Sequence, residues 1–299
     1  MDRFSRRRFL EMSSAAGLGI ALAAKGSKAQ ASAEAEYTPF KKALQLGHLP
    51  EKPDAERFKY AKEIGFDGLE IAPMADLDAA KRLGDAARAA GIAIHSIIYG
   101  GWGAPMSHPD PAVVDKGKKE IEAALRTAQA VGADAVLLVP GVVNDKVRYG
   151  EAWERSQANI RSLIPLAEEL KIVIAVENVW NKFLLSPLEF AKYVDEFQSP
   201  WIRAYFDIGN VVIFGYPEDW IRTLGKRLVK IHVKDFKRDG FQWCKLPYEG
   251  DVNWAEVRKA LQEVGYAGWI TEEFPGGDDA YLRELSRRMS LFGQGAAKA

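Results

Sequence analysis

The fold of this chain is decided between residues 171 and 274, by the four runs KIVIAVEN (171–178), WIRAYFDIGN (201–210), LVKIHVKD (228–235) and GWITEEF (268–274). Each run is short and apolar over most of its length, and segments with helical spacing separate one run from the next. This pattern is typical of buried parallel strands joined by helices, because the two strands of a hairpin need only a tight turn between them.

A polar side chain lies at or near the carboxyl end of every one of these runs. In a closed barrel of parallel strands, the carboxyl ends meet at one mouth, where catalytic residues gather. Three carboxylates and one imidazole that meet at one point form a ligand set for a divalent metal ion. The four residues are Glu177, Asp207, His232 and Glu273.

The rest of the chain alternates in the same way. Four further strands are expected at 43–46, 65–73, 92–99 and 135–139. Helices are expected at 54–64, 76–90, 111–131, 151–170, 187–197, 217–224, 253–264 and 279–291, the seventh with Asn253 and Glu256 as a capping pair. Eight strands alternating with eight helices predict an α/β fold, a single (β/α)8 TIM barrel, rather than a doubly wound open sheet.

Composition and charge exclude some classes of function. The chain has 299 residues, of which 47% are hydrophobic and 27% charged, as is usual for a globular protein. Residues 34–299 carry 35 basic and 39 acidic side chains, a net charge of −4. This mildly acidic body argues against a nucleic-acid partner, which favours a basic face. Cys244 is the only cysteine, so no internal disulfide can form.

The N-terminus differs in character from the body. It contains SRRRFL (5–10), a weakly apolar, Ala- and Gly-rich segment (12–24) and small residues that fit a cleavage site (29–33). The apolar part is too short to span a membrane, so no stable membrane insertion is expected. SRRRFL resembles the twin-arginine export signal, with a disordered basic tail as the alternative. We therefore expect a cleavable twin-arginine signal peptide at 1–33, a barrel at 34–299 and a periplasmic or extracellular location.

The predicted ligand set offers oxygen and nitrogen but no sulfur. Hard carboxylates with one imidazole suit Mn²⁺, the first choice, and also Mg²⁺ or Co²⁺, in a near-octahedral arrangement with two positions left for substrate oxygens; Zn²⁺ fits as well. A single Glu at a strand end more often pairs with a Lys, and a single His more often serves within a pocket. Four successive strand ends in the same phase favour one bound divalent ion.

The combined motifs resemble a known family. EN (177–178), DIGN (207–210), IHVKD (231–235) and GYAGWITEE (265–273) are similar to motifs of the xylose isomerase-like TIM-barrel superfamily. The likeness is greatest to its sugar-phosphate isomerase/epimerase branch, which includes L-ribulose- and L-xylulose-5-phosphate 3-epimerases and ketose 3-epimerases. It is densest over residues 186–274. The resemblance implies a small-molecule sugar or sugar derivative as the substrate, and a homodimer or homotetramer.

The resemblance also implies roles for the four predicted ligands. All four positions bind the metal in that family, and the positions of Glu177 and Glu273 also act as acid and base. Counted from Gly268, the family's last glutamate corresponds to Glu273 and not to Glu272, whose side chain points to the other face of the strand. The expected chemistry is removal of a proton next to a carbonyl, a metal-stabilised enediolate, and return of the proton by the second glutamate.

Other strand ends supply candidates for substrate binding. His48 and Glu70 could hydrogen-bond to sugar hydroxyls, and Trp102 could stack on a sugar face. Lys234 points the same way as the predicted imidazole ligand and could also contact the substrate. Asn210 is expected near the substrate, where it could orient the ligands. For each of these residues a structural role is the alternative.

The leading hypothesis is a divalent-metal-dependent sugar isomerase or epimerase. One alternative is a lyase that uses the same metal site for β-elimination from a 3-keto-glycoside. Another is a non-catalytic exported sugar-binding protein that keeps the barrel without turnover. The DNA-repair endonuclease branch of the superfamily is disfavoured, because it uses a larger cluster of His and carboxylate ligands, whereas this chain has only four histidines and an acidic body.

Overall fold

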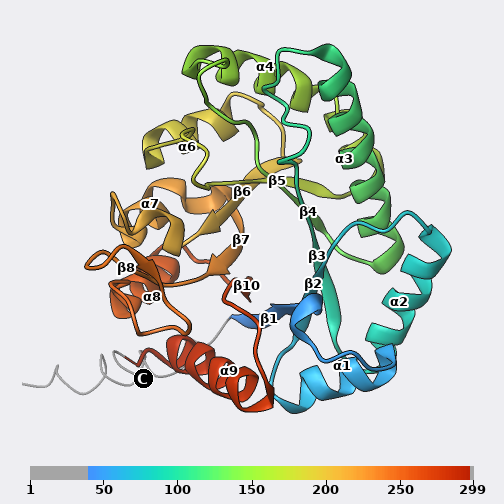
Figure 1. The fold of residues 1–299 in the computed structure, drawn as a ribbon, viewed down its shortest axis with the longest axis vertical. Helices are drawn as coiled ribbons and strands as arrows, with labels where there is room; N and C mark the ends of the chain where they lie inside the picture. The colour runs from blue at the N-terminus through green and yellow to red at the C-terminus, as the bar shows by residue number, and fades with distance from the viewer. Residues whose placement is uncertain (1–39, 297–299) are drawn as a thin grey trace, which may run out of the picture. The chain divides into compact units, whose positions relative to one another are not determined.

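A closed barrel of parallel strands forms the centre of the protein. The computed structural model describes residues 40–296, so the predicted signal peptide at 1–33 lies outside the described residues. Eight strands close in the order β1-β10-β7-β6-β5-β4-β3-β2, every neighbouring pair being parallel. Figure 1 looks into this ring of strands and shows the helices around its outside. The predicted TIM barrel is therefore confirmed.

The elements follow the predicted alternation. The barrel strands are β1 (Lys41–Gln45), β2 (Gly68–Ile71), β3 (Ala93–Gly100), β4 (Ala135–Leu138), β5 (Val173–Glu177), β6 (Ile202–Asp207), β7 (Leu228–Val233) and β10 (Trp269–Glu272). The α-helices are α1 (Asp54–Glu63), α2 (Leu77–Ala89), α3 (Pro111–Val131), α4 (Tyr149–Arg161), α5 (Ile164–Leu170), α6 (Pro187–Asp195), α7 (Pro217–Leu224), α8 (Trp254–Glu263) and α9 (Asp279–Gln294).

Two separate apolar cores explain why the strands read as continuous apolar runs. The larger core lies between the strands and the helices. A smaller cluster, Ala135, Leu137, Ala175 and Tyr205, is formed by residues of strands β4, β5 and β6. Strands of a β/α barrel are covered on both faces, so alternation between polar and apolar residues is lost.

Two helices illustrate how side chains cap the helix starts. The side chain of Asn253 accepts a hydrogen bond from the backbone N–H of Glu256 at 3.3 Å, which confirms the predicted cap of α8. Asp76 caps α2 in the same way, through the backbone N–H of Ala79. Within residues 40–296, none of the helices is both long enough and apolar enough to cross a membrane.

The predicted helix at 151–170 is wrong in one respect, because two helices occupy this segment. Helix α4 ends at Arg161, and α5 starts at Ile164. Pro165 lies in the first turn of α5. Its missing N–H and its ring would break the hydrogen bond to the carbonyl of Arg161, whereas the first turn of a new helix tolerates proline.

A small antiparallel hairpin, β8 (Phe236–Lys237) and β9 (Gln242–Trp243), follows β7. Strands of two residues are too short to show an alternation of apolar and polar residues, so the sequence does not predict this hairpin. Asp235 holds the segment that contains it, because its buried carboxylate accepts backbone N–H groups from Phe236, Gly250 and Val252. A Cβ atom on Gly250 would lie only 2.3 Å from the Asp235 carboxylate, so this close approach requires glycine.

Candidate metal centre and active site

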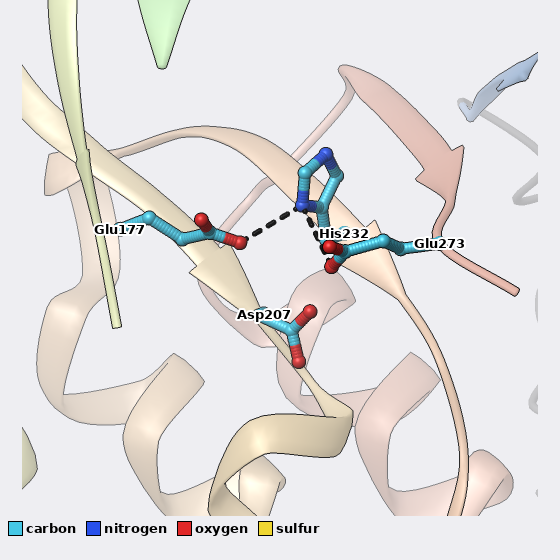
Figure 2. Close-up of side chains that lie close together, drawn as sticks. All are labelled: Glu177, Asp207, His232 and Glu273. Carbon is cyan, nitrogen blue, oxygen red and sulfur yellow. Dashed lines mark hydrogen bonds and ion pairs between the residues drawn. The ribbon is translucent and has the colours of Figure 1, made fainter. Parts of the chain in front are cut away.

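The four predicted ligands lie together at the carboxyl ends of four barrel strands. Glu177 ends β5, Asp207 ends β6, His232 is the penultimate residue of β7, and Glu273 follows β10. These strands are consecutive neighbours in the barrel. One ligand atom from each residue lies within 4.8 Å of those of the other three, and Figure 2 shows the side chains pointing toward one another.

Both ring nitrogens of His232 face carboxylates. Its Nδ1 lies 2.9 Å from Oε1 of Glu177 and 3.2 Å from Oε2 of Glu273. Its Nε2 lies 2.8 Å from Oε2 of Glu70, and the other oxygen of Glu70 accepts the hydroxyl of Tyr205 at 3.0 Å. Glu70 therefore fixes the imidazole with Nδ1 toward the cluster, as carboxylates behind metal-binding histidines do.

Hydrogen bonds reach the backbone of Asp207 and only one of its two carboxylate oxygens. The side-chain amide of Asn178 bonds both backbone polar groups of Asp207 at 2.9 Å, and the backbone N–H of Asn210 donates to Asp207 Oδ1 at 2.6 Å. The other carboxylate oxygen, Oδ2, is buried and accepts no hydrogen bond, and the same holds for Oε2 of Glu273. Buried carboxylate oxygens without a donor are costly unless a cation binds them.

Lys234 provides a cation at the edge of the cluster. Its Nζ lies 2.8 Å from Oε2 of Glu273 and 3.3 Å from Oδ2 of Asp207, although neither contact has hydrogen-bond geometry. Burial opposes the charged amine, but these two carboxylates outweigh it and raise the pKa of Lys234. The aliphatic part of Lys234 packs over Gly209. A Cβ atom at position 209 would lie 2.3 Å from Lys234 Cγ, so the glycine of the DIGN motif leaves the space that this side chain occupies.

The donor set fits a hard divalent cation. Four buried or half-buried carboxylates, including that of Glu70, face only two cations, so the fully ionised cluster carries an excess of negative charge. The two carboxylate oxygens that lack hydrogen bonds are members of this cluster. Three carboxylates and one imidazole match the ligands of Mn²⁺, Mg²⁺ or Zn²⁺ sites.

The cluster perturbs the protonation of its own members. Burial raises the pKa of Asp207 well above its usual range and also raises the pKa of Glu177. Burial acts in the same direction on Glu273, but His232 and Lys234 outweigh it and lower the pKa of Glu273. Burial opposes the imidazolium of His232, yet Tyr205 and the surrounding carboxylates raise its pKa well above the usual range. Without metal, the cluster therefore retains protons that a bound ion would displace.

We predict that metal binding releases protons and strengthens as pH rises from 5 to 8. The ion must replace protons on His232 and Asp207, whose pKa values are raised. Calorimetric titration at several pH values, in buffers with different heats of ionisation, measures both effects. A metal affinity independent of pH, with no proton released, would contradict this prediction.

The same pKa shifts predict how the stability of the metal-free protein depends on pH. The stabilising contribution of protonated His232 is complete below about pH 6.5 and is lost as pH rises through its higher folded pKa. Asp207, with a raised pKa, costs stability increasingly above about pH 4. The pKa of Glu273 is lowered, so its carboxylate stabilises the fold fully above about pH 4.3, and this stabilisation is lost only as pH falls below that value. Thermal unfolding with a chelator present should therefore show that His232 and Asp207 lower the stability of the protein as pH rises from 5 to 8.

A cavity of about 410 Å³ opens beside the cluster. Glu177 and Glu273 line it, together with three of the predicted substrate-binding residues, Trp102, Asn210 and Lys234. This arrangement places the two proposed acid/base groups beside space that a small molecule can occupy.

Two predicted substrate-binding residues have other partners and do not line this cavity. Glu70, inside β2, is 1% exposed, and its carboxylate contacts Nε2 of His232. His48 bonds Oε1 of Glu272 through Nδ1 at 2.8 Å. Glu272 also accepts the backbone N–H groups of Gln45 and Phe274, so its carboxylate joins neighbouring loops while Glu273 faces the cluster.

Three aromatic residues of the cavity, Tyr99, Trp180 and Trp243, were not predicted from the sequence. Trp180 follows the EN motif by two residues, and a large aromatic residue in a loop after a barrel strand is a usable signal for a binding site. Trp243 lies on the unpredicted β9 strand, so its position could not be read from the alternation of strands and helices.

Substitution of Glu70 should weaken metal binding without removing a ligand. Glu70→Gln replaces a charged acceptor of the His232 Nε2 proton by a neutral group that can present the wrong atom to the ring. We expect the metal affinity to fall by about 10- to 100-fold, as is typical when the carboxylate behind a ligating histidine is changed. Metal titration followed by calorimetry gives the dissociation constant. An affinity equal to that of the wild type would show that Glu70 does not orient the ligand.

This chain is similar to several known sugar epimerases. It is 26% identical over 260 residues to L-ribulose-5-phosphate 3-epimerase UlaE of Escherichia coli O1:K1, which covers 80% of this chain and 90% of that protein. A crystal structure of D-psicose 3-epimerase with D-fructose has 19% identity and a TM-score of 0.73, covering 86% of this chain and 100% of that one. The apo structure of 3-keto-D-glucoside 4-epimerase YcjR from E. coli has 16% identity and a TM-score of 0.73, with coverages of 85% and 98%.

The family assignment rests on a match to most of the chain. The sequence profile described as "Xylose isomerase-like TIM barrel" matches residues 58–290, which include the four clustered side chains and every barrel strand except β1. The relatives named above are sugar epimerases, which are isomerase-class enzymes. On the strength of the profile match and the closed eight-stranded barrel, this chain belongs to the xylose isomerase-like TIM-barrel family.

Proposed function

We propose that this protein is a divalent-metal-dependent sugar isomerase or epimerase in which Glu177 and Glu273 exchange the proton. The observation that carries the proposal is the position of these two carboxylates. Both line the cavity, and they come from β5 and from the end of β10, which β6 and β7 separate in the barrel. They therefore approach the cavity from two sides, as proton transfer on two faces of one carbon requires.

The residues of the cluster have distinct roles in this proposal. An ion held by Glu177, Asp207, His232 and Glu273 would act as a Lewis acid on neighbouring sugar oxygens and so acidify the adjacent C–H. Asp207 and His232 are fixed by Asn178 and Glu70, which leaves them as anchors. Lys234 lines the cavity, and its ammonium, which lies beside Glu273 and Asp207, can donate a hydrogen bond to a sugar oxygen.

Glu177 and Glu273 differ in protonation before the reaction starts. In the metal-free protein the pKa of Glu273 is lowered and that of Glu177 is raised, so Glu273 is ionised at a pH at which Glu177 still keeps its proton. Removal of a proton by one and its return to the opposite face by the other gives an epimer. Return to the neighbouring carbon gives an aldose–ketose isomer instead. The two groups titrate as a pair, because they share His232 and Lys234.

The proposed activity predicts exchange of one carbon-bound hydrogen with solvent. The metal-loaded protein would be incubated in D₂O with a panel of ketoses, aldoses and 3-oxidised sugars, each followed by NMR. We expect deuterium on the carbon next to the carbonyl and the appearance of an epimer or isomer, with no loss of a substituent. Binding without exchange in every sugar would contradict catalysis and favour a sugar-binding protein.

A second candidate is a lyase that performs β-elimination on a 3-keto-glycoside. The same proton abstraction begins both reactions, and the aromatic side chains around the cavity favour a substrate that carries a further ring. The NMR experiment separates the two, because elimination releases the aglycone and leaves an unsaturated sugar, whereas epimerisation keeps all substituents.

We also propose that the protein is exported through the twin-arginine route. The motif SRRRFL (5–10) and the following Ala- and Gly-rich segment support this proposal. Fractionation of cells that produce the full chain, with the pair Arg6 and Arg7 replaced by Lys in a control, tests it. Equal amounts of both proteins outside the cytoplasm would contradict a twin-arginine signal.

A further inference from the structure

Two tryptophans form one wall of the cavity beside the metal cluster. Trp180 and Trp243 line the cavity with ring centroids 4.8 Å apart and planes 33° from parallel. They are 39% and 41% exposed, so each keeps uncovered ring surface, although the ammonium of Lys234 lies over the Trp243 ring, 4.8 Å from its centre. The indole N–H of Trp180 donates to the backbone carbonyl of Asn210 at 2.8 Å, and Phe236 packs edge-on against both rings. The wall is therefore held in place before any ligand binds.

Aromatic groups also line the cavity from another strand. Tyr99 lies near the end of β3 and Trp102 in the loop that follows it. The hydroxyl of Tyr99 donates to Glu120 at 2.7 Å, which fixes its ring, whereas Trp102 is 54% exposed. Strands β4, β5 and β6 lie between β3 and β7 in the barrel, so these aromatic groups and the β9 tryptophan come from well-separated strands. A sugar ring presents an apolar C–H face that packs on such aromatic surfaces.

The charges around the cavity do not suit a phosphate group. Among the described residues that line it, Lys234 is the only cation, and its ammonium already faces the carboxylates of Glu273 and Asp207. Phosphate recognition normally uses free Arg or Lys side chains or a helix N-terminus.

We propose that the substrate is an uncharged glycoside, a sugar unit that reacts beside the metal cluster and carries a second sugar ring stacked on Trp180 and Trp243. This inference rests on the proposed function, because it specifies the substrate class of the same site. The cavity of about 410 Å³ lies within the range of roughly 300–1,000 Å³ that encloses a drug-sized ligand, which is larger than one sugar ring. The tryptophan wall and the lack of a free cation point to the same class.

The test compares ligands that share one sugar unit and differ in one substituent. Binding to the Mn²⁺-loaded protein would be measured by calorimetry for D-fructose, for its 1- and 6-phosphates, and for its 3-, 4- and 6-O-glucosides (turanose, maltulose and isomaltulose). We expect at least one glucoside to bind about tenfold more tightly than fructose, the scale of one ring stacking on aromatic side chains. Neither phosphate should bind more tightly than fructose.

Variants connect this preference to the wall. Trp243→Ala and Trp180→Ala should remove most of the difference between the preferred glucoside and fructose, while Phe214→Ala should leave it intact. Phe214 is also an exposed aromatic residue, at 52%, but it does not line the cavity. Trp102→Ala serves as a second test if loss of either wall tryptophan impairs folding, which thermal unfolding would reveal. It should weaken glucoside binding by several-fold.

The outcomes separate this inference from the proposed reaction. Tighter binding of a phosphate than of every glucoside, or no binding of any glucoside, would overturn the inference even if the protein epimerises a sugar. A tryptophan-dependent preference for a glucoside would support it even if no proton exchange is found in D₂O, in which case the proposed isomerase activity would fail alone. A glucoside preference that survives all three tryptophan variants would also overturn the inference.

Discussion

Replacement of Glu273 by Gln is expected to lower kcat by roughly 10²–10⁴-fold, the contribution of a positioned acid or base. The amide keeps an oxygen that can face the ion, but it cannot take a proton from the substrate. Glu273 faces His232 and Lys234, and its low pKa makes it the ionised partner of the pair. Turnover measured at saturating metal, together with the metal content of the variant, separates lost chemistry from lost binding.

Glu272→Gln is the matched control for this experiment. The two glutamates are adjacent, but Glu272 bonds Gln45, His48 and Phe274 instead of facing the cluster. We expect the Glu272 variant to be less stable and to retain metal-dependent turnover. Wild-type kcat in the Glu273 variant would contradict the assignment of the proton-transfer group.

Replacement of Asp207 by Asn is expected to abolish the stabilisation that metal gives to the fold. At a free metal concentration one hundred times the dissociation constant, the wild type should gain about 2.7 kcal/mol. For a protein of this size that corresponds to a rise in Tm of about 5–10 °C. The variant loses a charged ligand whose Oδ2 is buried without a hydrogen bond, so its Tm should scarcely respond to metal.

The same substitution should have the opposite effect when no metal is present. At pH 7 the metal-free wild type carries the cost of a buried carboxylate with a raised pKa, and the neutral amide of the variant would remove that cost. Thermal unfolding with a chelator should therefore show the variant to be at least as stable as the wild type. Asp145→Asn, at an exposed position, is the control and should respond to metal like the wild type. A full metal response in the Asp207 variant would contradict its role as a ligand.

The barrel and the position of the cluster can be predicted from the sequence for one physical reason. A strand that is buried on both faces is apolar over most of its length, so a charged residue that closes the apolar run marks its carboxyl end. Glu177 and Asp207 show this directly, because each is the last residue of its strand. Closure of the barrel then brings those ends together, and no further information is needed to place the four side chains near one point.

Other features depend on contacts that no local pattern encodes. Glu70 and His232 are 162 residues apart, so the buried pair is visible only once β2 and β7 face each other across the barrel. The β8–β9 hairpin, which carries Trp243, has strands too short for a period and is held by Asp235. The break between α4 and α5 is different, because Pro165 marks it in the sequence. Proline disrupts the interior of a helix, so this residue could have been used to predict the break.

The most direct test of the metal centre is anomalous diffraction from crystals grown with Mn²⁺, with data collected at the manganese absorption edge. We expect one strong peak among the side chains of Glu177, Asp207, His232 and Glu273, with Nδ1 as the histidine ligand and ligand distances of about 2.0–2.6 Å. A map without a peak at this point, or with its only peak elsewhere in the barrel, would contradict it.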